Sequence, residues 1–125
     1  MKLRIQGDAL RLRLSQTEVA RFAETGLVEE TLRIAPDAVF RFALERATRA
    51  GALCAVYKDG ALRIVVPGSE ARDWVSTERV GIAGEQVVAA GSSLKILVEK
   101  DFQCLHGDAE PDSDAFPNPL VTKGL

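Results

Sequence analysis

The chain has 125 residues, of which 46% are hydrophobic, 27% charged and 6% aromatic, a composition typical of soluble globular domains and not of disordered, collagen-like or membrane-spanning chains. Sixteen basic and 18 acidic residues give a formal net charge of −2, which offers little general attraction for nucleic acid or for anionic membranes. We therefore expect one domain that is large enough to bury a hydrophobic core.

The chain begins with two segments in which apolar and basic residues alternate. Residues 2–6 and 10–14 flank Gly7-Asp8, and this pattern predicts a β-hairpin with one basic face. The basic face holds Lys2, Arg4, Arg11 and Arg13. Guanidinium groups suit phosphate and carboxylate, so this face is a candidate anion-binding site, and a merely solvated face is the alternative. Nucleic acid is not favoured as the partner, because no aromatic side chains interleave with the cations.

A helix is predicted directly after this hairpin. Ser15 and Glu18 form a capping-box pattern, Val19 and Phe22 supply an apolar stripe, and Gly26 follows as a stop signal. We expect about three helical turns.

Two further segments predict strands on each side of residue 36. Residues 28–34 alternate, with Glu30 on the apolar side, where we expect it to reach water or to pair with an arginine rather than to act in catalysis. Residues 38–50 fit both a strand and a helix stripe, and we favour the strand.

The second half of the chain begins with a clear hairpin pattern. Alternating residues lie on both sides of Asp59-Gly60, a pair that supplies the positive φ angles of a tight turn. Pro67 ends the second arm, and a short second helix can form over residues 69–75 with Ser69 as its cap.

Glycines then indicate a loop-rich section around Val87 and Val88; they are Gly81, Gly84 and Gly91. The last predicted strand covers residues 94–99, and alternation places Leu94, Ile96 and Val98 on the core.

Together these elements predict an α+β domain over residues 1–106, a mainly antiparallel β-sheet or sandwich-like fold with one clear N-terminal helix. Residues 107–125 are rich in Asp, Pro, Gly and Asn and predict an irregular acidic tail that packs on the domain or extends from it. No internal repeat is seen at the periods of solenoid proteins. The two cysteines are far apart in sequence, which favours a reducing cytoplasm over a disulfide scaffold.

Candidate metal ligands gather near the C-terminus: Asp101, Cys104, His106, Asp108, Glu110, Asp112 and Asp114. A soft metal needs about four such ligands, and only Cys104 and His106 are close in sequence. The alternating acids resemble a calcium loop, but Ser113 and Pro119 stand where that loop needs Gly and a bidentate Glu. We prefer a buried Cys104 and a solvated acidic tail, with a divalent metal as the alternative.

Trp74 and Phe116 are the large apolar residues outside the predicted strands. A place in the core is the interpretation we favour for each. The alternative is a partner contact, which would also involve Pro117, Asn118 and Pro119.

Three segments carry a family resemblance: the opening Lys2-Leu3-Arg4-Ile5, the Leu10-Arg11-Leu12-Arg13-Leu14-Ser15 run, and Glu99-Lys100-Asp101-Phe102-Gln103-Cys104-Leu105 followed by Asp114-Ala115-Phe116-Pro117-Asn118-Pro119. With these the chain resembles a family of small bacterial proteins of unknown function over nearly its whole length. The resemblance implies a bacterial, single-domain, cytoplasmic protein and offers no activity, cofactor or catalytic residue to carry over. Residues 40–67 also resemble, in part, the strand-turn-strand of small heat-shock (α-crystallin) domains, although the early helix and the lack of an Ile-x-Ile tail depart from that family.

These observations predict a small, non-enzymatic, cytoplasmic binding or interaction module for a protein or small-molecule partner. No Walker loop, Gly-x-Gly-x-x-Gly or Gly-x-Ser-x-Gly motif is present. The alternative is a metal-binding protein or metal-dependent enzyme that uses Asp101, Cys104 and His106, and a chaperone similar to small heat-shock proteins comes third.

Overall fold

Eight strands and two helices make up the part of the chain that the computed structural model describes, which is residues 1–48, 51–102 and 116. In chain order they are β1 (Lys2–Gln6), β2 (Ala9–Leu14), α1 (Gln16–Thr25), β3 (Leu27–Ala35), β4 (Ala38–Arg46), β5 (Cys54–Lys58), β6 (Ala61–Val66), α2 (Gly68–Ser76), β7 (Gly81–Ala89) and β8 (Ser92–Lys100). Neither helix in this part of the chain is long and apolar enough to cross a membrane.

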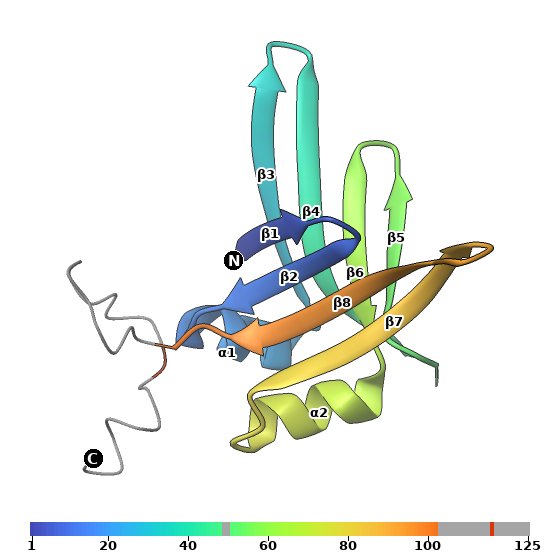
Figure 1. Ribbon diagram of the computed structural model, residues 1–125. Coiled ribbons are helices and arrows are strands. Elements are labelled where there is room, and N and C mark those ends of the chain that lie inside the picture. Colours follow the sequence, from blue (N-terminus) through green and yellow to red (C-terminus); the bar gives the residue numbers. More distant parts are fainter. Residues whose placement is uncertain (49–50, 103–115, 117–125) are drawn as a thin grey trace, which may run out of the picture.

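The strands form two four-stranded sheets (Figure 1). Sheet A has the order β1-β2-β8-β7, and sheet B has the order β3-β4-β6-β5. Within each sheet, consecutive strands pair as antiparallel hairpins, but the central pairs, β2 with β8 and β4 with β6, are parallel. The expected α+β fold with mainly antiparallel sheets is confirmed, and the two parallel central pairs are the part that the sequence did not indicate. The parallel pairs join strands that are distant in sequence, where local turn signals carry no information.

Helix α1 forms where its local signals predict it. The Ser15 side chain accepts a hydrogen bond from the Glu18 backbone N–H, and the Glu18 carboxylate accepts one from the Ser15 N–H at 3.0 Å. At the other end, Gly26 has φ 76° and its N–H donates to the Phe22 carbonyl at 2.8 Å. The capping box and the left-handed glycine therefore fix both ends of the helix.

Helix α2 is a complete second helix, but Ser69 does not cap it. Pro67 occupies the N-cap position, and its side chain makes no capping hydrogen bond. Pro67 has φ −56° and ψ 139°, the extended type of backbone conformation that an N-cap residue adopts. The cap expected at Ser69 is therefore wrong, because the N-cap lies two residues earlier, at Pro67, and Ser69 is inside the helix.

The segment expected to be loop-rich is strand β7, and its glycines serve close packing rather than turns. A Cβ atom on Gly84 would lie 3.1 Å from the Cβ of Leu53, and one on Gly81 would lie 3.0 Å from the carbonyl oxygen of Val98. Glycine in a strand often marks such a close approach of two segments. The loop prediction is therefore wrong for Gly81 and Gly84, whereas Gly91, with φ 77°, lies in the turn between β7 and β8.

Two other predicted segments are strands as expected. Residues 38–46 form β4, which decides the ambiguous segment in favour of the strand as far as residue 46. The β5–β6 hairpin turns at Asp59 and Gly60, which have φ angles of 52° and 73°.

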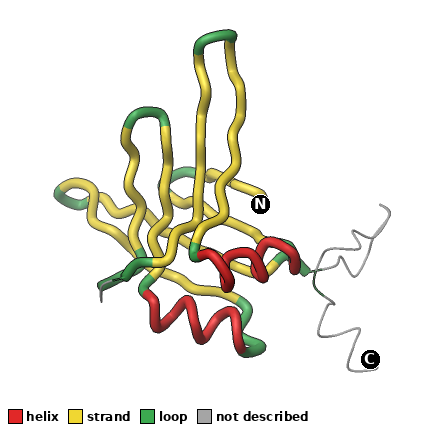
Figure 2. The backbone as a smooth tube through the Cα atoms, turned by 180° about the vertical axis from the view of Figure 1, so that it is seen from behind, coloured by secondary structure: helices red, strands yellow, loops and turns green. Residues whose placement is uncertain are grey.

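The inner faces of the two sheets share one hydrophobic core. Sheet A contributes Leu12 and Val98, and sheet B contributes Leu44 and Ile64, each at most 1% exposed. Figure 2 shows both helices at one end of the molecule, away from the tip of the β3–β4 hairpin. There Phe22 of α1 meets Trp74 of α2 edge to face, with ring centroids 6.0 Å apart.

A single side chain joins the edges of the two sheets where β5 meets β7. The Gln86 amide accepts a hydrogen bond from the Ala55 N–H at 2.8 Å and donates one to the Ala55 carbonyl at 3.0 Å. Replacing Gln86 by alanine is expected to lower the free energy of unfolding by about 1–2 kcal/mol, because two backbone groups lose their partner. Urea denaturation followed by circular dichroism measures this. Gln6→Ala, at an exposed strand position, is the matched control, and equal effects of the two changes would contradict the prediction.

Candidate functional site

The outer face of sheet A brings together the four basic residues of the first hairpin. In the β1–β2 register, Lys2 lies opposite Arg13 and Arg4 lies opposite Arg11. The intervening residues Leu10, Leu12 and Leu14 are buried in the core, so the basic residues point to the opposite face. The structure therefore places the predicted anion-binding residues on one surface.

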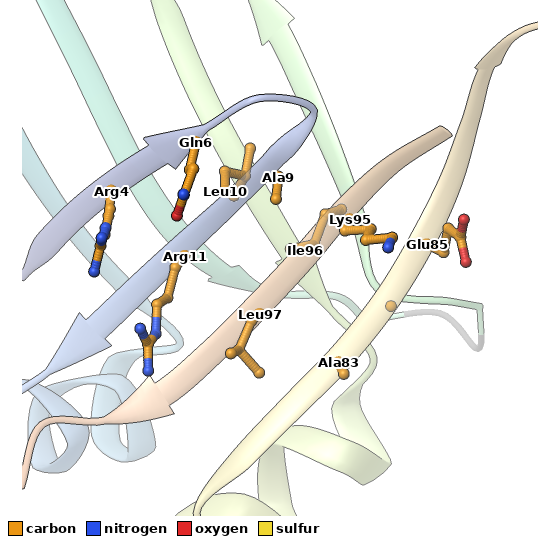
Figure 3. Close-up of a pocket in the computed structure, with 11 residues that line it drawn as sticks. Arg4, Gln6, Ala9, Leu10, Arg11, Ala83, Glu85, Lys95, Ile96 and Leu97 are labelled. Atoms are coloured by element: carbon orange, nitrogen blue, oxygen red, sulfur yellow. The ribbon is translucent and has the colours of Figure 1, made fainter. Parts of the chain in front are cut away.

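Strands β8 and β7 complete this face and make it hollow. Lys95 lies between Ala9 and Glu85 in the register, and Leu97 lies between Arg11 and Ala83. A groove of about 720 Å³ opens here, with Ala9, Ala83 and Leu97 in its floor and charged side chains around it (Figure 3). We call this the sheet A groove and define it by Arg4, Gln6, Ala9, Arg11, Ala83, Glu85, Lys95 and Leu97.

Carboxylates neutralise part of the positive charge on this face. The Glu99 carboxylate, whose side chain is 13% exposed, accepts hydrogen bonds from the Nε of Arg11 and, at 2.9 Å, from the Nε of Arg13. Asp101 accepts one from the Nζ of Lys2 at 2.7 Å. Arg4 and Lys95 form no ion pair with any described residue within 4.0 Å.

The remaining positive charge at the groove therefore comes from Arg4 and Lys95. Around it are one amide, Gln6, one carboxylate, Glu85, and the guanidinium of Arg11, which Glu99 holds in place. Guanidinium and ammonium groups donate charge-assisted hydrogen bonds to oxyanions. A set of this kind can hold an anionic group.

Asp101 is the one candidate metal ligand that the described residues include. It is 7% exposed, its carboxylate pairs with Lys2, and its N–H donates to the Leu14 carbonyl at 2.8 Å. The other candidates, Cys104, His106, Asp108, Glu110, Asp112 and Asp114, lie outside the described residues. Within residues 1–48, 51–102 and 116, no group of three His, Cys, Asp or Glu side chains is placed to hold a metal ion.

Of the five candidate partner contacts, the structure describes Trp74 and Phe116. Trp74 is 0% exposed and its Nε1 donates to the Val80 carbonyl at 2.9 Å, so it is a core residue and no partner reaches it in this structure. Phe116 is half-buried, packs on Phe102 with ring centroids 5.9 Å apart, and donates its N–H to the Asp101 carbonyl. Pro117, Asn118 and Pro119 lie outside the described residues.

Glu30 finds a partner other than the expected arginine. Its carboxylate accepts a hydrogen bond from the Met1 amino group at 2.7 Å and remains 41% exposed. Glu18 binds the same amino group. Burial opposes ionisation of Glu18, but hydrogen bonds from the Met1 amino group and from Ser15 outweigh it and hold the pKa of Glu18 below its usual value. Both acids therefore serve as ion-pair partners.

Two basic residues that the sequence patterns did not single out close the ends of the helices. Lys100 is 7% exposed, and its Nζ donates to the Thr77 carbonyl at 2.8 Å, at the end of α2. Burial lowers the pKa of Lys100, against the opposing charge of Glu78. Arg46 donates to the Ala23 carbonyl at the end of α1. Cations at helix C-termini satisfy free carbonyls and the helix dipole, so both residues have a structural role.

Comparison with known proteins places the chain in a protein family. The model of a family described as "Family of unknown function (DUF7009)" matches residues 1–120. No curated protein and no solved structure matches the chain. The match agrees with the resemblance to a family of unknown function seen in the sequence.

Proposed function

The chain belongs to this family of unknown function, and we propose that it is a non-enzymatic binding module whose sheet A groove holds the anionic group of a small molecule. The observation that carries the proposal is that Arg4 and Lys95 form no ion pair within 4.0 Å with a described residue and lie beside a floor that holds Ala9 and Ala83. We also propose that the protein is cytoplasmic, which the free thiol of Cys54 supports.

The floor of the groove matters as much as the charge. Exposed lysines and arginines are common on protein surfaces and rarely mark a site. Here Ala9 and Ala83 remove side-chain bulk on both sides of β8, so that a ligand can approach the sheet closely. Because three hydrogen-bonded strand pairs hold the groove, its cations stand on a rigid surface that needs little reordering to bind.

An ion pair with Glu99 already holds the Arg11 side chain in place before a ligand binds. Glu99 fixes the Nε of Arg11, which leaves the terminal nitrogens of that guanidinium available for a ligand. A carboxylate or phosphate group can then accept hydrogen bonds from Arg11 and from the unpaired Arg4 on the neighbouring strand, and Lys95 adds positive charge at the other side of the groove. Glu85 lies beside Lys95, so we expect ligands with one anionic group to be preferred over polyanions.

The first test is a titration of isotopically labelled protein with inorganic phosphate, and separately with acetate, at low ionic strength. Saturable shifts are expected for the backbone amide signals of Ala9, Ala83 and Lys95. The double variant Arg4→Glu with Lys95→Glu is expected to weaken binding by about tenfold or more, because each charged hydrogen bond contributes about 1.5–3 kcal/mol.

The matched control carries the same change in charge at a distance from the groove. Arg21→Glu with Arg72→Glu alters two exposed helix positions, and it is expected to leave the shifts unchanged. Equal weakening in both double variants would mean that only net charge matters. That result, or shifts that never saturate at Ala9 and Ala83, would contradict the proposed function.

A further inference from the structure

The chain contains the same structural unit twice. Residues of β1-β2-α1-β3-β4 and of β5-β6-α2-β7-β8 each form a hairpin, a helix and a second hairpin. Exchanging the two units converts the strand order of sheet A, β1-β2-β8-β7, into that of sheet B, β5-β6-β4-β3. Figure 1 shows the result: each sheet combines the first hairpin of one unit with the second hairpin of the other. The fold therefore has an internal twofold relation.

Individual residues follow the same relation. Residues 9–14 read Ala-Leu-Arg-Leu-Arg-Leu and residues 61–66 read Ala-Leu-Arg-Ile-Val-Val. In the parallel pairs, Leu12 lies opposite Val98 and, correspondingly, Ile64 lies opposite Leu44. The backbone hydrogen bonds just after the parallel pairs also correspond. The Asp101 N–H donates to the Leu14 carbonyl, and the Ala47 N–H donates to the Val66 carbonyl, both at 2.8 Å.

The relation extends to the charged outer faces of the sheets. In sheet A, Ala9 lies opposite Lys95 and Arg11 pairs with Glu99; in sheet B, Ala61 lies opposite Arg41 and Arg63 pairs with Glu45. The Arg63 Nη1 and the Glu45 Oε2 are 3.7 Å apart. Both faces therefore place an alanine beside a cation, with a carboxylate-bound arginine two residues farther along the strand.

A hollow of about 410 Å³ lies at this equivalent place on sheet B, and we call it the sheet B groove. Its lining residues are Arg41, Val56, Lys58, Asp59, Ala61 and Arg63. Lys58 and Arg41 flank Ala61 in the register, so their Cα atoms are about 10 Å apart, twice the spacing of neighbouring strands. Neither cation forms an ion pair with a described residue within 4.0 Å. An oxyanion above Ala61 is within reach of both long side chains.

We infer that the sheet B groove is a second anion-binding site, so that each chain binds two small ligands with phosphate or carboxylate groups. Arg41, Ala61 and Arg63 occupy the places of Lys95, Ala9 and Arg11, whereas Lys58 stands where sheet A has Gln6, and Val56 where it has Arg4. The inference rests on the proposed function for the chemical class of the ligand. The two grooves lie on the outer faces of two sheets that pack through a common core, so one small ligand does not bridge them. Two independent sites follow.

The test uses the full chain and the phosphate and acetate titrations described above. Saturable shifts are expected for the amide signals of Ala61 and Arg63 in addition to those of Ala9 and Ala83. The variant Arg41→Glu with Lys58→Glu is expected to weaken binding at the sheet B groove by about tenfold or more and to leave the sheet A shifts unchanged. Isothermal titration calorimetry is expected to give two ligands per chain for the natural protein and one for the variant.

The outcomes separate the two proposals. Saturation at Ala9 without shifts at Ala61 overturns the second site and leaves the proposed function standing, whereas shifts at Ala61 alone overturn the proposed function. If the shifts at both grooves disappear together in Arg41→Glu with Lys58→Glu, the sites are not independent and the inference is wrong. Arg41→Gln with Lys58→Gln removes the same cations without reversing charge, and it replaces the first variant if that one does not fold.

Discussion

Replacing Trp74 by alanine is expected to lower the free energy of unfolding by about 3–5 kcal/mol. The side chain is completely buried, meets the ring of Phe22 at an interplanar angle of 70°, and satisfies the Val80 carbonyl through its Nε1. The alanine variant leaves a large cavity between the helices and removes that hydrogen bond. Trp74 is the only tryptophan, so urea denaturation has to be followed by far-ultraviolet circular dichroism.

The conservative variant Trp74→Phe separates packing from hydrogen bonding. It keeps most of the ring contact and loses the Nε1 donor, so a smaller loss of about 1–2 kcal/mol is expected. Phe22→Ala removes the other ring and is expected to fall in the same range as Trp74→Ala. A loss below about 1 kcal/mol for Trp74→Ala would contradict its place in the core and would restore the interpretation as a partner contact.

The elements that could be predicted from the sequence are those fixed by neighbouring residues. Helix α1 has its cap, its apolar stripe and its stop signal within residues 15–26, and all three act as expected. The β5–β6 turn lies where Asp59 and Gly60 adopt the positive φ angles that their sequence indicates. Signals of this kind depend on local backbone geometry and hydrogen bonding, so they can be recognised in the sequence without knowledge of the rest of the fold.

The elements that could not be predicted depend on contacts between distant segments. The glycines of β7 resemble loop residues in sequence, and only Leu53 and Val98, which approach them closely, explain why a strand tolerates them there. The parallel pairing of β2 with β8 has no signal in the turns. The twofold relation was also hidden, because clear sequence similarity between the units is confined to short runs such as residues 9–14 and 61–66.

The candidate site likewise combines residues that local patterns place correctly with a residue that only long-range strand pairing brings in. Alternation alone placed Arg4 and Arg11 on one face of the first hairpin, and the register confirms it. Lys95 comes from a strand at the other end of the chain, so its place beside Ala9 could not be foreseen. Its position was still encoded, because alternation around the buried Ile96 and Val98 puts Lys95 on the outer face.

The exchanged hairpins have a consequence for unfolding. Each sheet contains strands from both units, and its two central strands come from different units. Neither unit can unfold without breaking the parallel strand pair at the centre of each sheet. We therefore expect the two units to unfold together, in one cooperative transition.

Alanine substitutions at two equivalent core positions test this cooperativity. Leu12→Ala and Ile64→Ala remove side chains that are 0% and 1% exposed, and each is expected to lower the free energy of unfolding by about 2–5 kcal/mol. Because the two residues occupy corresponding places in the parallel pairs, the two losses should agree within about 1 kcal/mol. Fluorescence of Trp74, which lies in the second unit, and far-ultraviolet circular dichroism are expected to give the same midpoint for each variant. Two separate transitions, or a shift of the Trp74 signal in only the Ile64→Ala variant, would show that the units unfold independently, which the shared sheets do not allow.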